Sequence, residues 1–390
     1  MNALDMLTWA VLVVAACPLV YYSLAIYCAW DYFRRAHKAA PPNRSFTPPA
    51  SILKPVRGLD SEAYANFASF CQLDYPEYEI IFAAGSEDDP IVPVIRQLQQ
   101  DFPQRDIRLL TTVAWAGTNR KVNKMCALAK EAKHSVLVIS DSDVRVERDY
   151  LREAVGPLSN PTTGLVTTLF RGKSSGGIFS ELDGLGVPAD SAAGALVARK
   201  LEGRMNFAFG WTMATTKLHL ADIGGLEAIA NHHSDDFELG NRMAREGHKV
   251  VFMRKPVWMV FPHETLSQLL QHELRWAIGL RNVRPAGYLG LALTFGLAWS
   301  VLAAIVAPTL AIGAAYLAAY FVLRYAMAWT VGVWGIGDPI TRRSLWLVPV
   351  RDALNITIWI AGLFSNTISW RGSMFRVKEG LLMPLPEAKR

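Results

Sequence analysis

A long uncharged run near the start of the chain, Leu7–Trp30, does most to limit what this sequence can fold into. It exceeds the roughly 20 apolar residues that a helix needs to cross a bilayer. A cleaved signal peptide is the rival interpretation, but the run lacks a preceding basic region and a small-residue cleavage site at its end. The basic residues Arg34, Arg35 and Lys38 follow it. By the positive-inside rule, we therefore expect a membrane anchor, with the next part of the chain in the cytoplasm.

A second uncharged region, Leu289–Leu323, continues past Arg324 to Gly337. Pro308 near its middle interrupts a helix, so we expect two spans joined by a tight hairpin. The shorter stretch Ala353–Trp370 is compatible with a span, a re-entrant segment or an interfacial helix, because basic residues follow it. The sequence thus predicts one N-terminal and two or three C-terminal transmembrane helices.

Charge and cysteine usage exclude several classes of protein. The net charge is +6, and the basic excess lies mostly near apolar segments, as in proteins of a membrane surface. The chain has no basic-aromatic module or recognition motif, which argues against nucleic-acid binding. Its four cysteines show no paired spacing, so neither a disulfide framework nor a zinc site is predicted from them.

The region between the apolar segments is the only stretch able to build a sizeable aqueous core. We expect an anchor over 1–39, a cytosolic α/β domain over 40–285 with an interfacial helix at its end, and a membrane region with a basic tail over 286–390. Strand-like runs at 50–53, 78–84, 107–110 and 136–139 alternate with helical patterns at 92–101 and 122–132. Such alternation predicts a Rossmann-like, mostly parallel sheet with crossover helices.

Two carboxylates, Asp141 and Asp143, follow the apolar strand at 136–139. In an open α/β sheet, ligands bind outside the carboxyl ends of the strands. Two carboxylates one residue apart suit a hard divalent cation that keeps part of its coordination for substrate phosphates. A polar turn is the simpler interpretation, since Asp and Ser are common turn residues.

Four more polar clusters lie at predicted strand ends, loops or helix starts. The acidic run at 87–89 is either a base or ribose contact or a solvated turn. The run 119–124 begins a helix where Lys and Arg can hold phosphate, or is an ordinary basic helix start. Ser234 or Asp235 can cap a helix, but capping explains only one of the two aspartates Asp235 and Asp236. Arg275 and Trp276 lie in the amphipathic stretch Leu266–Arg281, where a surface helix anchored by Trp is the alternative.

The order of these clusters resembles that of the ceramide glucosyltransferases and their bacterial relatives, including the hopanoid glycosyltransferases. These are membrane-anchored glycosyltransferases of the GT-A fold. The family pattern consists of an early acid, an Asp-Ser strand end, an acidic-Asp-aromatic motif and Gln/Arg-x-x-Arg-Trp. In this chain the matching residues are, in the same order, 87–89, 141–143, 235–237 and 272–276. Further similarities at 54–58, 119–123 and 370–372 extend the likeness over nearly the whole chain. His272 stands where Gln or Arg is usual, so the contact made there does not carry over.

The resemblance implies a metal-dependent, inverting transfer of a sugar, glucose being favoured, from a UDP-sugar to a lipid hydroxyl such as that of ceramide. It assigns Asp236 as the base that accepts the proton of the hydroxyl, with Arg275 and Trp276 as further catalytic residues. Mg²⁺ or Mn²⁺ is expected on Asp141 and Asp143. The expected substrate-binding residues are Lys54, Glu87, Asp89, Lys121, Asn123, Asp235 and His272. Among the early acids, Asp89 is favoured for the acidic role and Glu87 for the nucleotide base.

Several alternatives remain open on the sequence alone. The acceptor is either ceramide or another lipid, and transfer of N-acetylglucosamine to the hopanoid bacteriohopanetetrol is the main alternative. A processive polysaccharide synthase shares the acidic pair and the Arg-Trp motif but usually has more spans. An inactive membrane scaffold and a metal-dependent hydrolase are weaker alternatives. We expect a multi-pass protein with its catalytic domain in the cytoplasm, in a bacterial inner membrane.

Overall fold

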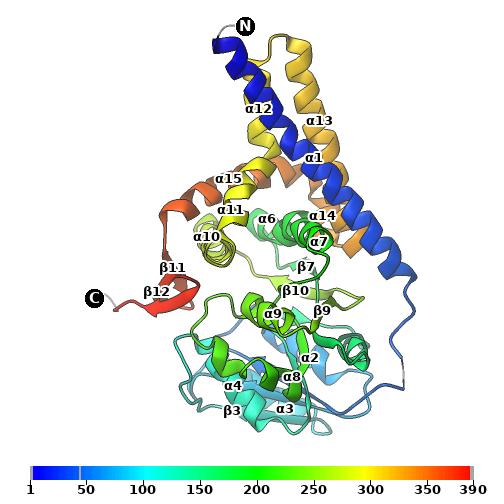
Figure 1. Cartoon of the computed structure of the whole chain (residues 1–390). Helices are drawn as coiled ribbons and strands as arrows, with labels where there is room; N and C mark the ends of the chain where they lie inside the picture. The colour runs from blue at the N-terminus through cyan, green and yellow to red at the C-terminus, as the bar shows by residue number, and fades with distance from the viewer. Residues whose placement is uncertain (1–2, 44, 387–390) are drawn as a thin grey trace.

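The computed structural model describes residues 3–43 and 45–386 of the chain. Apolar helices project from one end of the molecule and an α/β domain forms the other end (Figure 1). Three helices, α6, α7 and α10, lie between these two parts, and a small C-terminal sheet lies beside α10. The chain therefore has its aqueous and apolar regions at opposite ends, joined by a helical layer.

A seven-stranded sheet forms the α/β domain, in the order β3-β2-β1-β4-β8-β6-β9. Strands β3, β2, β1 and β4 run parallel, whereas β8 is antiparallel to both of its neighbours. This confirms the predicted mostly parallel α/β sheet. The strands are β1 (Ala50–Pro55), β2 (Tyr78–Ala83), β3 (Asp106–Leu110), β4 (Val136–Ile139), β6 (Thr163–Thr167), β8 (Met213–Thr216) and β9 (Lys249–Phe252).

The central strands are apolar without alternation because both faces of the sheet are covered. Successive residues Ile52 and Leu53 of β1 belong to two separate core clusters, and so do Val138 and Ile139 of β4. The helices of this domain are α2 (Ala63–Cys71), α3 (Val92–Asp101), α4 (Arg120–Glu131), α5 (Tyr150–Val155), α8 (Lys217–Asp222) and α9 (Asp235–Arg245). The helices predicted at 92–101 and 122–132 are confirmed as α3 and α4.

A second sheet, β5-β10-β7, carries the chain toward the membrane side of the molecule. It consists of β5 (Val144–Arg145), β7 (Phe170–Ser174) and β10 (Val257–Phe261). The helical layer above it contains α6 (Ile178–Gly186), α7 (Ala192–Leu201) and α10 (Leu266–Val283). Helix α10 begins with a capping box formed by Thr265 and Gln268, which satisfies the first free backbone N–H groups. The amphipathic helix predicted at 266–281 is thus confirmed.

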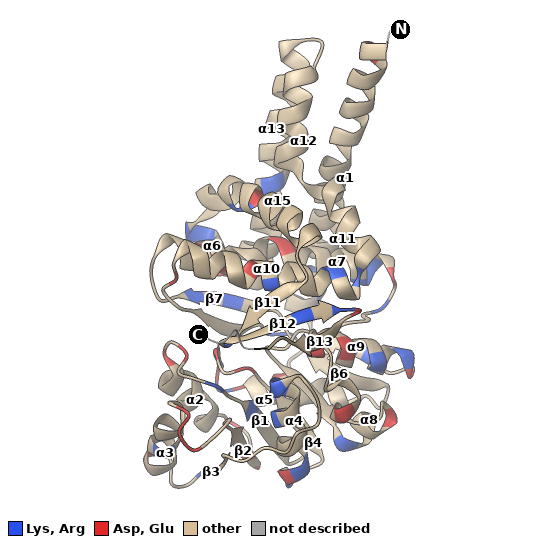
Figure 2. Ribbon diagram, turned by 90° about the vertical axis from the view of Figure 1, so that its left-hand side faces the viewer, with Lys and Arg blue, Asp and Glu red and all other residues tan. Residues whose placement is uncertain are grey.

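The described chain holds three helical segments long and apolar enough to cross a membrane: Ala3–Lys38, Leu310–Ile336 and Leu345–Phe364. A fourth candidate is the pair Pro285–Thr294 and Gly296–Val306, bent by 47°. The predicted hairpin at Pro308 is the loop between α12 (Gly296–Val306) and α13 (Leu310–Ala328). The outer parts of α1, α12 and α13 are almost free of charged side chains (Figure 2). The other elements are α1 (Ala3–Lys38), α11 (Pro285–Gly290), α14 (Pro339–Arg343) and α15 (Val348–Phe364).

Helix α15 lies across the base of the bundle formed by α1, α12 and α13 (Figure 1). The three-stranded sheet that follows it packs against α10, on the same side as the α/β domain. The sheet consists of β11 (Thr367–Trp370), β12 (Ser373–Lys378) and β13 (Leu381–Pro384). The described part of the chain after α15, up to residue 386, therefore lies on the same side of the molecule as the α/β domain.

A buried arginine at the foot of the bundle joins the apolar helices to the rest of the protein. Arg324 of α13 is 2% exposed and pairs with Asp352 of α15 at 2.7 Å and with Asp190 at 2.6 Å. Asp190 belongs to the wide helical turn Val187–Ser191 between α6 and α7. Tyr320 donates a further hydrogen bond to Asp352. One guanidinium group therefore fixes three segments relative to each other.

We expect Asp352→Ala to lower the free energy of unfolding by about 3–5 kcal/mol, because it leaves a buried guanidinium group without its main partner. The thermal unfolding midpoint of the detergent-purified protein measures the loss. Arg342→Met, at an exposed position of α14, is the matched control and should leave the midpoint unchanged. Equal midpoints for Asp352→Ala and the control would show that this pair contributes little.

Candidate active site

A single large cavity of about 1550 Å³ extends from the carboxyl end of β4 to the feet of the apolar helices. At its aqueous end it is lined by Lys121, Asp141, Asp143, Asp235 and Asp236. At its other end it is lined by aromatic and aliphatic side chains of α1, α12, α13 and α15, among them Tyr21, Leu297, Met327 and Trp359. Within the described residues, the cavity therefore brings together the predicted carboxylates and the predicted membrane segments.

Asp141 and Asp143 emerge from the end of β4 as predicted. The ammonium group of Lys54 lies beneath them, where it donates hydrogen bonds to the carbonyl of Asp141 and to the hydroxyl of Ser140. Burial lowers the pKa of Lys54 to about 7, although Asp141 and other nearby carboxylates oppose that shift. Lys54 is fully buried and also lies 4.0 Å from the ring of Phe70. It therefore supports the carboxylate loop from below.

The carboxylate of Asp143 is a suitable ligand for a divalent cation. Its Oδ1 is buried and has no hydrogen-bond partner among the described residues. Burial and the nearby carboxylates of Asp141 and Asp60 raise the pKa of Asp143 to about 7. Oxygen ligands of this kind suit Mg²⁺ or Mn²⁺, and a cation would relieve both the burial and the repulsion. The residues present therefore fit the predicted metal.

Lys121 lies between the carboxylates of Asp141 and Asp235. Its ammonium group is 2.7 Å from Asp141 Oδ1 and 3.3 Å from Asp235 Oδ2. Asn119 caps α4 by accepting hydrogen bonds from the N–H groups of Lys121 and Val122, which fixes where the lysine side chain begins. Burial disfavours its charge, but the surrounding carboxylates raise the pKa of Lys121 well above its ordinary value. Lys121 is thus a fixed cation at the aqueous end of the cavity.

Asp236, in the first turn of α9, faces the same space. Its carboxylate accepts hydrogen bonds from the N–H of Gly210 at 2.9 Å and from its neighbour Phe237 at 2.8 Å. Burial and the charge of Asp235 raise the pKa of Asp236 to about 6, against the opposing effect of Lys121. A carboxylate with such a pKa can accept a proton near neutral pH.

Gly210 forms the floor between these groups. A methyl group built on its Cα would lie 3.1 Å from Lys121 Nζ, 3.2 Å from Asp141 Oδ2 and 3.4 Å from Asp236 Oδ2. The three charged groups therefore converge on one point of the backbone. The absence of a side chain at this position leaves room for a ligand between them.

Arg275 and Trp276 of α10 line the cavity as well. The guanidinium group of Arg275 lies 5.8 Å from the ring of Trp370, and the structure gives it no carboxylate partner within the described residues. Burial and the nearby Arg371 lower the pKa of Arg275. An unpaired buried cation beside a cavity is suited to an anionic ligand. Trp276 packs edge-on against His272, with 4.8 Å between the ring centroids.

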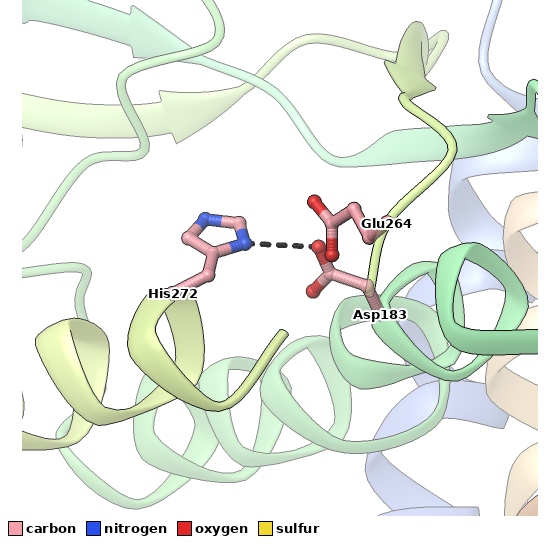
Figure 3. A group of neighbouring side chains, drawn as sticks. All are labelled: Asp183, Glu264 and His272. Atoms are coloured by element: carbon pink, nitrogen blue, oxygen red, sulfur yellow. Dashed lines mark hydrogen bonds and ion pairs between the residues drawn. The ribbon is translucent and has the colours of Figure 1, made fainter. Parts of the chain in front are cut away.

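His272 is held by a partner that the sequence did not indicate. Its Nδ1 lies 2.9 Å from Oδ2 of Asp183, which comes from α6, and Glu264 lies close to both (Figure 3). Burial lowers the pKa of His272, but Asp183 raises it more, so the net shift is upward. All three side chains line the cavity.

Four of the predicted substrate-binding residues do not line the cavity. Lys54 lies beneath it, and Asn123 binds the backbone N–H groups of Ala116 and Gly117. Asp89 accepts hydrogen bonds from the N–H groups of Gly58 and Ile91 and so holds the loop after β1. Glu87 is half exposed and pairs with Arg96. The structure therefore brings together Lys121, Asp141, Asp143, Asp235, Asp236, His272, Arg275 and Trp276, and leaves these four outside.

The site also contains Asp60 and Arg371, which the sequence analysis did not select. Arg371 lies in the turn between β11 and β12, where it and Gly372 both have positive φ, as a two-residue hairpin turn requires. Its guanidinium group pairs with both oxygens of Asp60, at 2.7 and 3.2 Å. Asp60 also accepts a hydrogen bond from Ser142, between the two carboxylates of β4. The Trp-Arg-Gly run at 370–372 was the only sequence signal for this contact.

Comparisons with known proteins agree with this geometry. The family model described as Glycosyl transferase family 21 matches residues 10–383. Ceramide glucosyltransferase 3 of Caenorhabditis elegans is 24% identical over 383 residues, covering 93% of this chain and 79% of that protein. The ceramide glucosyltransferase of Komagataella phaffii is 28% identical over 170 residues, covering 41% of this chain and 32% of that protein.

One solved structure extends the comparison to the fold. It is a mannosyltransferase from Pyrobaculum calidifontis in complex with GDP-Man and Mn²⁺. Its TM-score is 0.59 at 19% sequence identity, and the match covers 91% of this chain and 99% of that one. This likeness shows that the predicted GT-A fold is correct.

We expect Gly210→Ala to lower turnover by on the order of 10- to 100-fold, because the added methyl displaces the charged groups that meet there. Initial rates in detergent, at matched thermal stability, measure the effect. Gly85→Ala is the control, since a methyl at Gly85 meets its neighbours only at 3.9 and 4.0 Å. Wild-type turnover by Gly210→Ala would mean that the space above this glycine is not used by a substrate.

Proposed function

The chain belongs to glycosyltransferase family 21, and on this premise we propose that it transfers a sugar, glucose being favoured, from a UDP-sugar to the hydroxyl of a membrane lipid such as ceramide. The observation that carries the proposal is the cavity, whose one end is charged and whose other end is lined by the apolar helices. A water-soluble donor and a bilayer-bound acceptor need a chamber of this composition if their reacting atoms are to meet.

The donor end is suited to a nucleoside diphosphate. Lys121 and Arg275 supply positive charge beside the Asp141–Asp143 pair. Departure of the diphosphate from the sugar leaves additional negative charge on its phosphate oxygens, and fixed cations in a buried site stabilise such charge strongly. When bound by Asp141 and Asp143, Mg²⁺ or Mn²⁺ supplies further Lewis-acid stabilisation of the leaving diphosphate.

The acceptor hydroxyl needs a base, and we assign that role to Asp236. The carboxylate takes the proton from the hydroxyl while the hydroxyl oxygen forms a bond to the anomeric carbon. The bond from that carbon to the diphosphate breaks at the same time, and the electron pair leaves with the phosphate oxygen. Attack from the face opposite the diphosphate inverts an α-linked donor to a β-glycoside. The N–H groups of Gly210 and Phe237 keep the carboxylate in a fixed orientation.

The end of the cavity that is lined by the apolar helices is the part that we assign to the acceptor lipid. Drawing a lipid chain out of the bilayer costs roughly 0.8 kcal/mol for each CH₂ exposed to water. A cavity lined in part by α1, α12, α13 and α15 lets the tails remain in an apolar environment while the head group reaches the carboxylates. We assign the α/β domain to the cytoplasmic side of the membrane, a bacterial inner membrane, because the basic residues Arg35 and Lys38 lie in the last turn of α1, where the chain leads into that domain.

Asp236→Asn should lower kcat by about 10²–10⁴-fold while donor affinity changes little, because the amide cannot accept the proton. Rates of glycolipid formation and the Kd of the UDP-sugar, measured on the same preparation, separate the two effects. Near wild-type turnover by this variant would remove Asp236 from the role of base.

The pH profile gives an independent check on the same residue. Because the carboxylate must be ionised to accept a proton, kcat/KM should fall as the pH drops through about 6, the value to which the pKa of Asp236 is raised. Below that pH the fall should approach tenfold for each pH unit. If kcat/KM falls at the same acidic pH in Asp236→Glu and in the wild type, a group other than Asp236 causes the fall.

Removal of the divalent cation with EDTA should lower turnover by on the order of 100-fold or more, and Mn²⁺ or Mg²⁺ should restore it. Asp141→Ala should lose the metal-dependent part of donor binding. Donor affinity that is the same with and without EDTA, in both proteins, would contradict the assignment of a metal to Asp141 and Asp143.

Lipid mass spectrometry identifies the substrates. The purified protein is incubated with UDP-glucose or UDP-N-acetylglucosamine, and with ceramide or bacteriohopanetetrol. A hexose on ceramide is the expected product. An N-acetylhexosamine on the hopanoid would keep the mechanism and change the substrates, whereas a polymeric product would indicate a processive synthase. No product with any pair would contradict the proposed function.

A further inference from the structure

Three potential metal ligands meet in the wall of the cavity, apart from the Asp141–Asp143 pair. Asp183 comes from α6, Glu264 from the segment between β10 and α10, and His272 from the second turn of α10. One ligand atom from each lies within 4.8 Å of the others. Figure 3 shows the imidazole and the two carboxylates facing one another. These side chains are distant in sequence and are brought together by the packing of α6 against α10.

The charges around the cluster are only partly paired. Arg351, whose charge acts on Asp183, already pairs with Glu273 at 2.7 Å. Arg275 also lies near Asp183 and His272 and has no carboxylate partner within the described residues. The two carboxylates of Asp183 and Glu264 therefore share one imidazole and one nearby guanidinium group.

Two carboxylate oxygens of the cluster also lack partners. Oδ1 of Asp183 and Oε2 of Glu264 are buried and accept no hydrogen bond within the described residues. Asp183 is only 2% exposed, so water does not solvate it. A buried carboxylate without sufficient partners is costly, and bound cations are one of the few ways in which proteins offset that cost.

We propose that Asp183, Glu264 and His272 form a second divalent-cation site, suited to Zn²⁺ or a related transition metal. The mixed set of imidazole nitrogen and carboxylate oxygen is typical of Zn²⁺ rather than of Mg²⁺ or Ca²⁺, which prefer oxygen alone. Ligand atoms at about 2.0–2.2 Å from a tetrahedral zinc are about 3.3–3.6 Å apart. Side-chain shifts of on the order of 1 Å therefore close the present arrangement around an ion.

The site has three protein ligands and borders the cavity. Three ligands with one position open to substrate or water is the pattern of catalytic rather than closed structural zinc sites. The three side chains line the same cavity as Trp276 and Arg275. A cation there has a free position for a hydroxyl oxygen of a ligand in the cavity. This inference does not depend on the identity of the donor or acceptor.

The experiment measures metal content rather than sugar transfer. The full-length protein, purified in detergent without donor or lipid acceptor, is stripped with EDTA, dialysed against Zn²⁺ and then against metal-free buffer. Metal per chain is measured by mass spectrometry, and Co²⁺ is used as a spectroscopic probe, since coordination by nitrogen and oxygen in a four-coordinate site gives visible absorption. The variants are His272→Gln, Asp183→Asn and Glu264→Gln, with Asp141→Asn as the control for the other carboxylate pair.

We expect about one Zn²⁺ per chain to be retained by the wild type and by Asp141→Asn, and at least a tenfold weaker affinity in the three cluster variants. Glu264 is partly exposed, so Glu264→Gln should fold normally even if Asp183→Asn does not. Unchanged zinc retention in His272→Gln and Glu264→Gln would overturn the proposal, and so would a wild type that retains no zinc. Either result would show that the cluster is an ion pair between His272 and Asp183. If a variant loses transferase activity but still binds zinc, the result bears on the proposed function and not on the zinc site.

Discussion

The burial of Arg324 is the constraint on which the arrangement of the whole protein depends. A guanidinium group cannot lie in an apolar environment without partners, and Asp352 and Asp190 are the two that the fold supplies. Asp352 comes from α15, which lies across the base of the bundle, and Asp190 comes from the turn between α6 and α7. The membrane segments therefore cannot change their position relative to the glycosyltransferase domain without separating buried charges. This fixes the position of the cavity with respect to the apolar helices.

The charged end of that cavity is balanced in a different way. Lys121 lies among Asp141, Asp235 and Asp236, and its single charge does not neutralise theirs. Arg275 and Arg371 lie near enough to influence the same carboxylates, and only Arg371 has an anionic partner of its own. The site thus holds anionic and cationic groups that are only partly paired with each other. Such an arrangement stabilises ligands that carry both a cation and phosphate groups.

The sequence was sufficient to predict four strands of the main sheet, β1 to β4, and the carboxylates that follow β4. Asp141 and Asp143 were predictable because a short apolar strand can deliver its following residues only to one edge of a parallel sheet. Lys54 was predicted as a substrate contact through the resemblance to the family. It belongs to β1, however, which lies between β2 and β4 and is buried along its whole length, so its side chain turns under the loop of β4.

Contacts between distant segments were beyond the sequence for a physical reason. The position of Gly210 depends on the loop before β8, and nothing in the local pattern shows that its Cα will face three charged groups. Asp183 was not selected from the sequence, because its partner His272 lies on another helix. The same holds for Asp60 and Arg371. Local periodicity determines which side of a helix or strand is buried, but not which distant side chain meets it there.

The pair between Asp60 and Arg371 has a consequence for how the protein is made. Its two members are separated by 311 positions in the chain, and the second belongs to the hairpin that follows the last apolar helix. A ribosome releases the strands of the α/β domain long before it releases that hairpin. The newly made domain therefore lacks the contact between Arg371 and Asp60 until nearly the whole chain has been synthesised. The last part of the chain to be made is thus needed to complete the site.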